Sequence, residues 1–153
     1  MHRGGILLPR EKVVELVRNR EGPLGSEYFA DSVPIGNCVR KIAAWKSQGA
    51  TILYLTSRRT QDEVQTIRNI LAKYQFPYGE LLFRKAGDEY RDVAERVLPD
   101  VIVEDDCESI GGEEEMTYPR IKSELKMRIK SIVVREFGGI DHLPDDVSDL
   151  LVC

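Results

Sequence analysis

Two patterns of apolar positions alternate along the chain. Short runs rich in β-branched and other apolar residues predict buried strands. These runs lie at residues 5–8, 51–56, 80–83, 100–104 and 131–134. Between them the pattern predicts helices over residues 10–20, 34–48, 60–74, 88–98, 118–128 and 145–151. Strands alternating with helices predict an α/β fold with a mostly parallel sheet covered on both faces.

Several residues mark the expected ends of these elements. Pro9 stops the first strand, and Pro34 suits the first turn of a helix that Gly49 would end. Thr60 and Glu63 form a capping-box pattern at the start of the next helix, where each side chain can bond a free amide. These signals place the helix boundaries independently of the apolar spacing.

Polar and glycine residues follow four of the predicted strands. In a parallel sheet with right-handed crossovers, the carboxyl ends of the strands meet at one edge, where ligands bind. The segments that follow these ends are Thr56, Arg84-Lys85, Glu104-Asp105-Asp106 and Gly138-Gly139. The sequence therefore predicts a binding site built from segments that are far apart in the chain.

The acidic run after the fourth strand is the most distinctive of these segments. Glu104, Asp105 and Asp106 are consecutive carboxylates, with Glu108 close behind. Like charges at a strand end repel one another unless a cation or hydrogen-bond donors neutralise them. Mg²⁺ prefers such oxygen ligands and takes one or two carboxylates. We expect a Mg²⁺ site here, while a solvated acidic loop is the ordinary alternative.

The hydroxyl and basic residues at the same edge suit a phosphate group. Thr56 or Ser57 can hold a phosphate oxygen, and Lys85 or Arg84 can neutralise the charge of a phosphoryl group. Taken alone, the first pair is more often a turn and helix cap, and the second pair is ordinarily solvent-facing charge.

Composition and charge narrow the class of protein. The 153 residues carry a net charge of −4, and 22 basic residues are scattered, so we expect no nucleic-acid partner. The three cysteines, Cys38, Cys107 and Cys153, form no CxxC pair, which argues against zinc and against a disulfide scaffold. The two histidines, His2 and His142, give little support to His-based catalysis. No apolar run approaches the length of a membrane span, so we expect a cytoplasmic protein without a membrane partner.

The ordered motifs resemble those of the haloacid dehalogenase-like (HAD-like) hydrolase superfamily. Residues 51–58 are similar to its second motif, a hydrophobic strand that ends in Thr or Ser. Lys85 resembles the basic residue of the third motif, and residues 101–106 resemble the strand-borne acidic pair of the fourth. The resemblance covers residues 33–151, and residues 1–32 are an atypical N-terminal segment of what we expect to be a single domain, 1–153.

This resemblance implies a fold and a chemistry. The fold would be a three-layer Rossmann-like sandwich, and the chemistry Mg²⁺-dependent phosphoryl transfer through an aspartyl-phosphate. Thr56 would bind the transferring group, Lys85 would stabilise its charge, and Glu104 with Asp105 would hold Mg²⁺. Arg84 and Asp106 are the neighbouring alternatives for the last two roles. The expected protein is a phosphatase acting on a small phosphorylated molecule.

One motif of the superfamily is missing. Its first motif, a strand ending in Asp-x-Asp, supplies the nucleophile and the acid/base. Nothing between Met1 and Thr56 matches it, and the first Asp in the chain is Asp31. Either the protein begins upstream and Met1 is internal, or it is a non-catalytic phosphate- and Mg²⁺-binding domain. A third hypothesis makes residues 113–130 a protein-docking appendage, against the simpler interpretation of a solvated helix.

The position of that motif in the sheet sharpens the choice. In the superfamily its strand lies in the middle of the sheet, between the strands of the second and fourth motifs. Without it two long strand edges would be unpaired, which proteins avoid. Either residues 6–8 fill the position, or the chain is an incomplete domain.

Overall fold

The computed structural model describes residues 6–9 (as backbone), 34–56, 60–85, 87–108, 111–136 and 138–152. Its strands are β1 (Ile6–Pro9), β2 (Ile52–Thr56), β3 (Glu80–Phe83), β4 (Val101–Asp105) and β5 (Lys130–Val134). Its α-helices are α3 (Cys38–Ser47), α4 (Gln61–Lys73), α5 (Tyr90–Val97), α6 (Ser123–Lys126) and α7 (Val147–Leu150). Two 3₁₀ turns, η2 (Gly112–Glu115) and η3 (Tyr118–Arg120), lie between β4 and α6.

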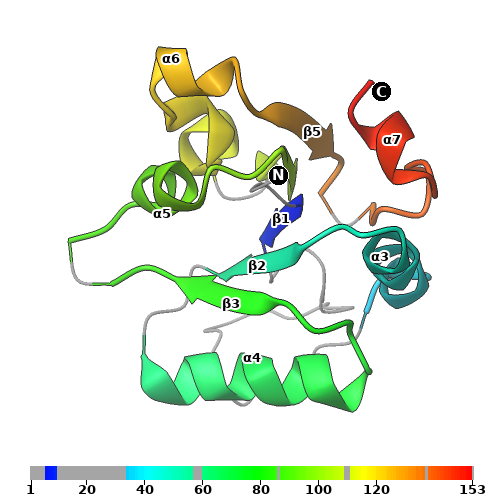
Figure 1. Cartoon of the computed structure of the whole chain (residues 1–153). Helices are drawn as coiled ribbons and strands as arrows, with labels where there is room; N and C mark the ends of the chain where they lie inside the picture. Colours follow the sequence, from blue (N-terminus) through cyan, green and yellow to red (C-terminus); the bar gives the residue numbers. More distant parts are fainter. Residues whose placement is uncertain are drawn as a thin grey trace.

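The five strands form one open sheet in the order β3-β2-β1-β4-β5 (Figure 1). All four neighbouring pairs are parallel. A parallel sheet needs a long crossover between consecutive strands, and here helices supply most of these connections. The α/β class and the parallel sheet expected from the sequence are therefore confirmed.

Strand β1 occupies the middle of the sheet. It pairs with β2 along its whole length, from Ile6 to Pro9, but with β4 only through Ile6 and Leu7. Proline has no amide hydrogen to give to a ladder, so it suits a position where pairing with the second neighbour has ended. The sequence left open whether residues 6–8 fill the central position of the sheet. In the structure, the strand Ile6–Pro9 lies there.

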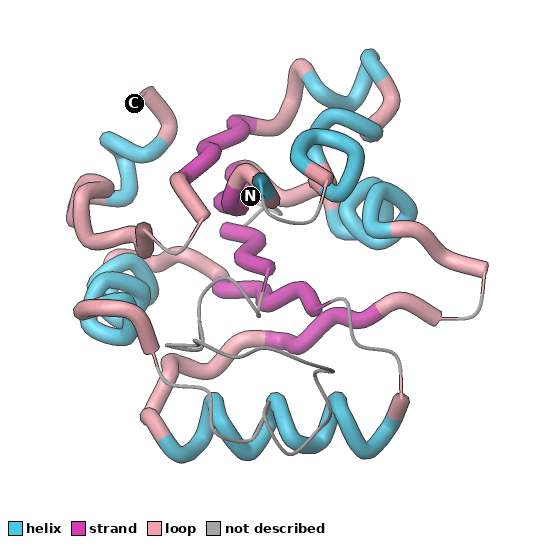
Figure 2. The backbone as a smooth tube through the Cα atoms, turned by 180° about the vertical axis from the view of Figure 1, so that it is seen from behind, coloured by secondary structure: helices cyan, strands magenta, loops and turns pink. Residues whose placement is uncertain are grey.

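Two hydrophobic clusters lie on opposite faces of the sheet, because neighbouring residues of a strand point to opposite sides. In β4, Val101 and Val103 belong to one cluster and Ile102 to the other. The first cluster takes in side chains of α3, α4 and α7, and the second those of α5 and α6. Figure 2 shows the strands running through the middle of the molecule with helices on both sides.

The expected caps are mostly confirmed. Helix α3 begins at Cys38, later than the apolar pattern predicts, because Gly36 has a φ of +55° that a right-handed helix does not allow. Gly49, with a φ of +102°, follows its last turn as expected. At the start of α4, the Thr60 hydroxyl oxygen accepts the amide hydrogen of Glu63 at 3.2 Å.

The helix predicted over residues 118–128 is wrong. Only the short η3 and α6 form there, because Ile121 between them is extended, with φ −70° and ψ 145°. The amides of Thr117 and Tyr118 also bond to the carboxylate of Glu104 instead of to a helical turn. The helix predicted over residues 10–20 lies outside the described residues.

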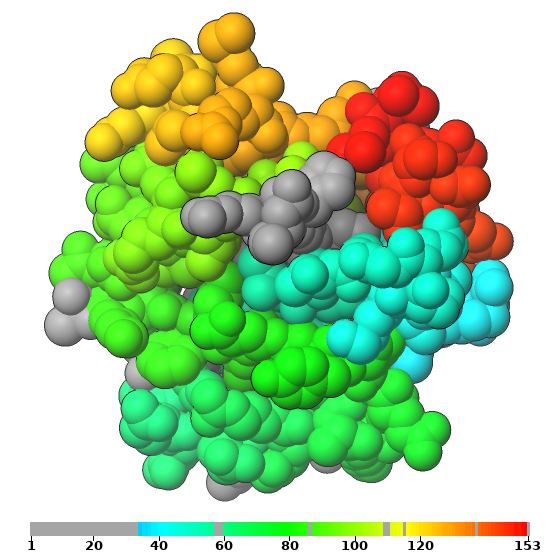
Figure 3. Space-filling model, viewed as in Figure 1, coloured from blue at the N-terminus to red at the C-terminus, as the bar shows by residue number. Residues whose placement is uncertain are grey.

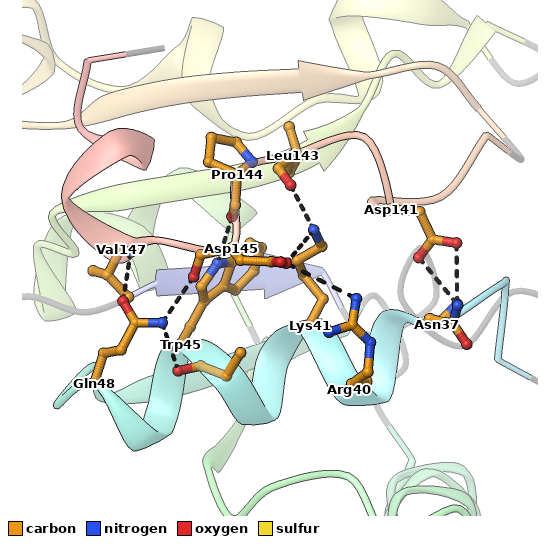
Figure 4. A network of polar contacts seen from close by, with 11 residues as sticks. Asn37, Arg40, Lys41, Trp45, Gln48, Asp141, Leu143, Pro144, Asp145 and Val147 are labelled. Atoms are coloured by element: carbon orange, nitrogen blue, oxygen red, sulfur yellow. Dashed lines mark hydrogen bonds and ion pairs between the residues drawn. The ribbon is translucent and has the colours of Figure 1, made fainter.

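A polar network ties α3 to the end of the chain (Figure 4). The ammonium of Lys41, 4% exposed, donates to the carbonyl of Leu143 and to the carboxylate of Asp145, both at 2.6 Å. The indole of Trp45 donates to the carbonyl of Pro144 at 2.9 Å. In Figure 3 the cyan surface of α3 lies directly beside the orange and red surface of residues 138–152. These bonds hold α3 and α7 on the same side of the sheet.

Candidate functional site

Thr56 and Asp105 end their strands on the same face of the sheet and at the same level. Ile52 and Val101 are both register partners of Ile6, and each candidate residue lies four positions further along its strand. Strands are spaced about 4.8 Å apart, so the two Cα atoms lie about 10 Å apart with β1 between them. Both side chains are buried, Thr56 at 0% and Asp105 at 2% exposure. The structure thus places at one level a hydroxyl and a carboxylate that the sequence separates by 49 positions.

Asp105 and Asp106 are held by the turn that follows β4. One oxygen of Asp105 accepts the amide hydrogen of Cys107 at 3.1 Å and lies 3.2 Å from its sulfur. Asp106 donates its own amide to Val134 of β5, and its carboxylate accepts the amide of Glu108 at 3.1 Å. The two carboxylates are therefore fixed at the end of β4, one buried and one half-buried.

Glu104 points away from Asp105. Its side chain lies on the opposite face, where it is 3% exposed. One oxygen accepts the amide of Thr117 at 2.8 Å and the other the amide of Tyr118 at 2.9 Å. Burial raises the pKa of Glu104 above its usual value, while these two hydrogen bonds act in the opposite direction. Its observed role is to anchor the segment after β4.

Arg84 and Lys85, which follow β3, differ in exposure. The guanidinium of Arg84 lies 4.5 Å from the centre of the Tyr90 ring, held against α5. Lys85 is exposed, and its backbone is fixed because its amide donates to the carboxylate of Asp88 and its carbonyl accepts the amide of Asp88. The Lys85 side chain is thus the one of the two that is presented to solution. Ser57, the remaining phosphate-binding candidate, lies outside the described residues.

The three acids do not converge on one point. Within the described part of the chain, no three or more His, Cys, Asp or Glu side chains are arranged to hold a metal ion. In the turn after β4, Asp105 accepts the Cys107 amide and Asp106 accepts the Glu108 amide, whereas Glu104 accepts the Thr117 amide on the face opposite Asp105. Two carboxylates are the number that Mg²⁺ commonly takes.

Sequence reasoning missed two features of the structure. The first is a surface hollow of about 410 Å³ in the segment that follows β4, lined by Gly111, Glu113, Glu114, Pro119 and Arg120. The second is the buried Lys41, whose position between Cys38 and Trp45 on the apolar face of α3 could have signalled it. No signal in the sequence marks the hollow, because it exists only once residues 111–120 fold back on β4.

None of the helices that the structure describes has the length and the apolar character needed to cross a bilayer.

Neither the family models nor the curated proteins include a match to this chain. Among solved structures, a chain of the Pnkp1/Rnl/Hen1 complex is similar, with a TM-score of 0.63 over 87% of this chain and 14% identity. A chain of the Pnkp1/Rnl/Hen1 RNA repair complex has a TM-score of 0.60 over 88% of this chain and 15% identity. This chain covers 46% and 43% of those chains, so it spans less than half of their length. At such low identity the likeness concerns the fold.

The likeness to chains of an RNA repair complex contradicts two expectations from the sequence. The first is the function of a HAD-like phosphatase, a hydrolase of a small phosphorylated molecule. The second is the exclusion of nucleic acid as a partner. That exclusion relied on the negative net charge and the scattered basic residues. These two criteria test for a broad basic surface that contacts many phosphates, and they do not test for contact with a single end of a nucleic-acid chain.

Proposed function

We propose that this chain is a domain that recognises the terminal phosphate of an RNA at the carboxyl edge of its sheet. The observation that carries the proposal is the placement of Thr56 and Asp105 on one face and at one level, on either side of β1. A hydroxyl can donate a hydrogen bond to a phosphate oxygen, and the exposed Lys85 after β3 supplies positive charge.

RNA is the proposed substrate class because the similar solved structures are of an RNA repair complex. The charge of this chain fits the end of an RNA better than a long stretch of it. Contact with many phosphates requires many clustered cations, and a net charge of −4 disfavours such binding. A single terminal phosphate requires only a few donors and one or two cations.

The fold is further proposed to be a three-layer Rossmann-like sandwich of the HAD-like kind. The strand order supports this, because β1 lies between β2 and β4, as the first-motif strand does in that superfamily. The two hydrophobic clusters on opposite faces agree with three layers. The central strand Ile6–Pro9 carries no carboxylate, so the proposal concerns binding of the phosphate and not its transfer through an aspartyl-phosphate.

Mg²⁺ is proposed as the cation of this site, with Asp105 and Asp106 as its protein ligands. Both present hard oxygen atoms at the end of β4, and Mg²⁺ commonly keeps several waters beside one or two carboxylates. A bound ion would neutralise part of the charge of the phosphate. Glu104 is not included, because both of its oxygens accept backbone amides on the other face.

The test is a binding titration with a short fluorescent RNA carrying a 3′-phosphate, a 5′-phosphate or neither, in Mg²⁺. Charge-assisted hydrogen bonds contribute about 1.5–3 kcal/mol, so one phosphorylated form is expected to bind about 10- to 100-fold more tightly than the unphosphorylated RNA. Lys85→Ala should remove much of this preference.

The matched control is Lys46→Ala, which changes an exposed lysine of α3 that bonds the Tyr78 carbonyl before β3, at the amino ends of the strands. This variant should keep the preference of the unmodified chain. Equal affinity for phosphorylated and unphosphorylated RNA would refute the proposed function.

A further inference from the structure

The segment after β4 leaves the strand and returns to it, forming a loop tied at its base. At one end, the amide of Gly112 donates to the carbonyl of Cys107 at 2.8 Å. At the other end, the amides of Thr117 and Tyr118 donate to the carboxylate of Glu104, inside β4. Residues 111–120 are named here the return loop. Compact loops of this kind, with adjacent ends, are frequently functional.

Glu104 is the main anchor of the return loop. It is 3% exposed and Thr117 is 2% exposed, so these amides have little access to water. A buried amide that loses its partner is costly, so the carboxylate and the loop depend on each other. Within the return loop, the Nε of Arg120 donates to the Glu114 carbonyl at 3.0 Å, which closes the loop on itself.

The return loop shapes the hollow in the segment that follows β4. It is a shallow hollow of about 410 Å³ that is open to solvent, so it could cover only one side of a ligand. The Glu113 and Glu114 carboxylates disfavour a phosphate there but can accept hydrogen bonds from the amino groups of a nucleobase. The guanidinium of Arg120 can donate to ring nitrogen or carbonyl acceptors, or stack on the base. The hollow therefore suits a nucleobase and not the phosphate itself.

The return loop begins at the turn that ends β4 at the phosphate edge. The Gly112–Cys107 hydrogen bond joins the start of the return loop to the turn that carries Asp105 and Asp106. In a nucleotide, the nucleoside is bonded directly to the phosphate. A ligand with its phosphate at the strand ends would thus direct its terminal nucleoside toward the return loop.

We propose that the return loop receives the terminal nucleoside of the bound RNA in this hollow, and that Glu104 is the positioning residue that holds the loop in place. The inference rests on the proposed function and specifies which part of the RNA, besides the phosphate, the domain recognises.

The experiment compares inorganic phosphate with each of the four nucleoside monophosphates and with the preferred phosphorylated RNA. The variants are Glu104→Gln and Arg120→Ala. The unmodified chain should bind at least one nucleoside monophosphate about tenfold or more tightly than inorganic phosphate, as expected for one or two added hydrogen bonds to charged groups. Both variants should lose most of that difference and keep their affinity for inorganic phosphate.

The matched control is Glu95→Gln. Glu95 also accepts a backbone amide, that of Lys122 at 2.9 Å, but this contact is exposed and outside the hollow. The control should bind all ligands like the unmodified chain. Hydrogen exchange at the amides of Thr117 and Tyr118 should accelerate in Glu104→Gln and stay unchanged in Arg120→Ala and in the control.

The outcomes separate the inference from the function on which it rests. Suppose that the unmodified chain prefers phosphorylated RNA but Arg120→Ala binds every nucleoside monophosphate as tightly as the unmodified chain does. In that case the inference is wrong and the proposed function stands. The inference is also overturned if Glu104→Gln no longer binds inorganic phosphate while Arg120→Ala still prefers a nucleoside monophosphate to inorganic phosphate as the unmodified chain does. Arg120 is exposed, so its variant keeps the test valid even if Glu104→Gln fails to fold.

Discussion

Three consecutive carboxylates at the end of β4 have three different environments. Glu104 is buried and anchors the return loop, Asp105 is buried on the opposite face beside Cys107, and Asp106 is half-buried and links β4 to β5. The alternation of side chains along a strand separates the first two, although they are neighbours in sequence. A run of like residues therefore need not form one site.

Replacing Asp105 with Asn is expected to weaken Mg²⁺ binding by at least about tenfold, since removal of even an indirect metal contact typically costs that much. Asparagine keeps the size of the side chain and its ability to accept from Cys107, but loses the charge. Calorimetric titration with Mg²⁺ would measure the change, with the exposed Glu108→Gln as control. Unchanged affinity in Asp105→Asn would mean that the metal assignment is wrong.

Cys38 is expected to make the folded state less stable in alkaline solution. Burial raises the pKa of its thiol from 9.0 to about 11, so between these values the unfolded chain releases the proton and the folded chain keeps it. The stability is complete below about pH 9 and is lost as the pH rises, by about 2 kcal/mol near pH 10.5.

Urea unfolding at pH 8 and pH 10.5, followed by the fluorescence of the buried Trp45, would measure this loss. Cys38→Ala should show a smaller loss than the unmodified chain. Burial and the charge of Cys38 both raise the pKa of Tyr54, so the difference between the two proteins reports Cys38 together with its effect on Tyr54. An identical loss in both would contradict the prediction.

At the scale of elements, helix α3 depends on the end of the chain as much as on the sheet. Lys41 reaches across 102 sequence positions to Leu143, and Gln48 reaches Asp145 and Val147 (Figure 4). Such contacts fix the helix against one face of the sheet. They also explain why a lysine can lie on the apolar side of α3, since its ammonium donates to two oxygen atoms, those of Leu143 and Asp145.

Lys41→Met is expected to destabilise the protein by about 1–3 kcal/mol, because the buried carbonyl of Leu143 loses its donor. The apolar stem of methionine should fill most of the same space. Thermal or urea unfolding would measure the effect. Lys46→Met, a change of an exposed lysine in the same helix, should stay within about 0.5 kcal/mol of the unmodified chain.

Lys41→Met should also change the pKa of Asp145. The hydrogen bond from Lys41 is the main reason that the pKa of Asp145 lies below its usual value. A lowered pKa favours the folded state above the unfolded pKa, and this contribution is lost as the pH falls. In Lys41→Met the pKa should return toward the ordinary range, which an NMR titration would detect. A pKa that stays low would assign the shift to other groups.

At the scale of the whole molecule, the sheet couples the two hydrophobic clusters. Adjacent residues of β4 enter opposite clusters, Ile102 one and Val103 the other. Loss of packing on one face should therefore loosen the strand that also supports the other face.

Ile102→Ala should lower stability by about 2–5 kcal/mol, because its side chain is 0% exposed and the cavity cannot close fully. Trp45 lies in the other cluster, yet its fluorescence transition should shift together with the loss of secondary structure measured by circular dichroism. Val133→Ala, at a side chain that is 50% exposed, is the control with little effect. A Trp45 transition that does not move would mean that the two faces unfold independently.

The sequence by itself determined the class of fold and the position of the candidate site along the chain. Apolar spacing has a period of two in strands and 3.6 in helices, so the strands β2, β3, β4 and β5 and the helices α4 and α5 could be predicted closely. Parallel connections place all strand ends on one edge, which is why Thr56, Lys85 and Asp105 could be named as neighbours.

Only the tertiary structure decided how the side chains at that edge are used. Glu104 turns away to hold residues 117 and 118, Lys41 is buried against Leu143, and the hollow of the return loop forms between residues 111 and 120. Each of these features depends on hydrogen bonds between residues that are distant in sequence or across a loop. Local periodicity does not specify such bonds, because the energy of a buried polar group depends on the partners that the complete fold brings to it.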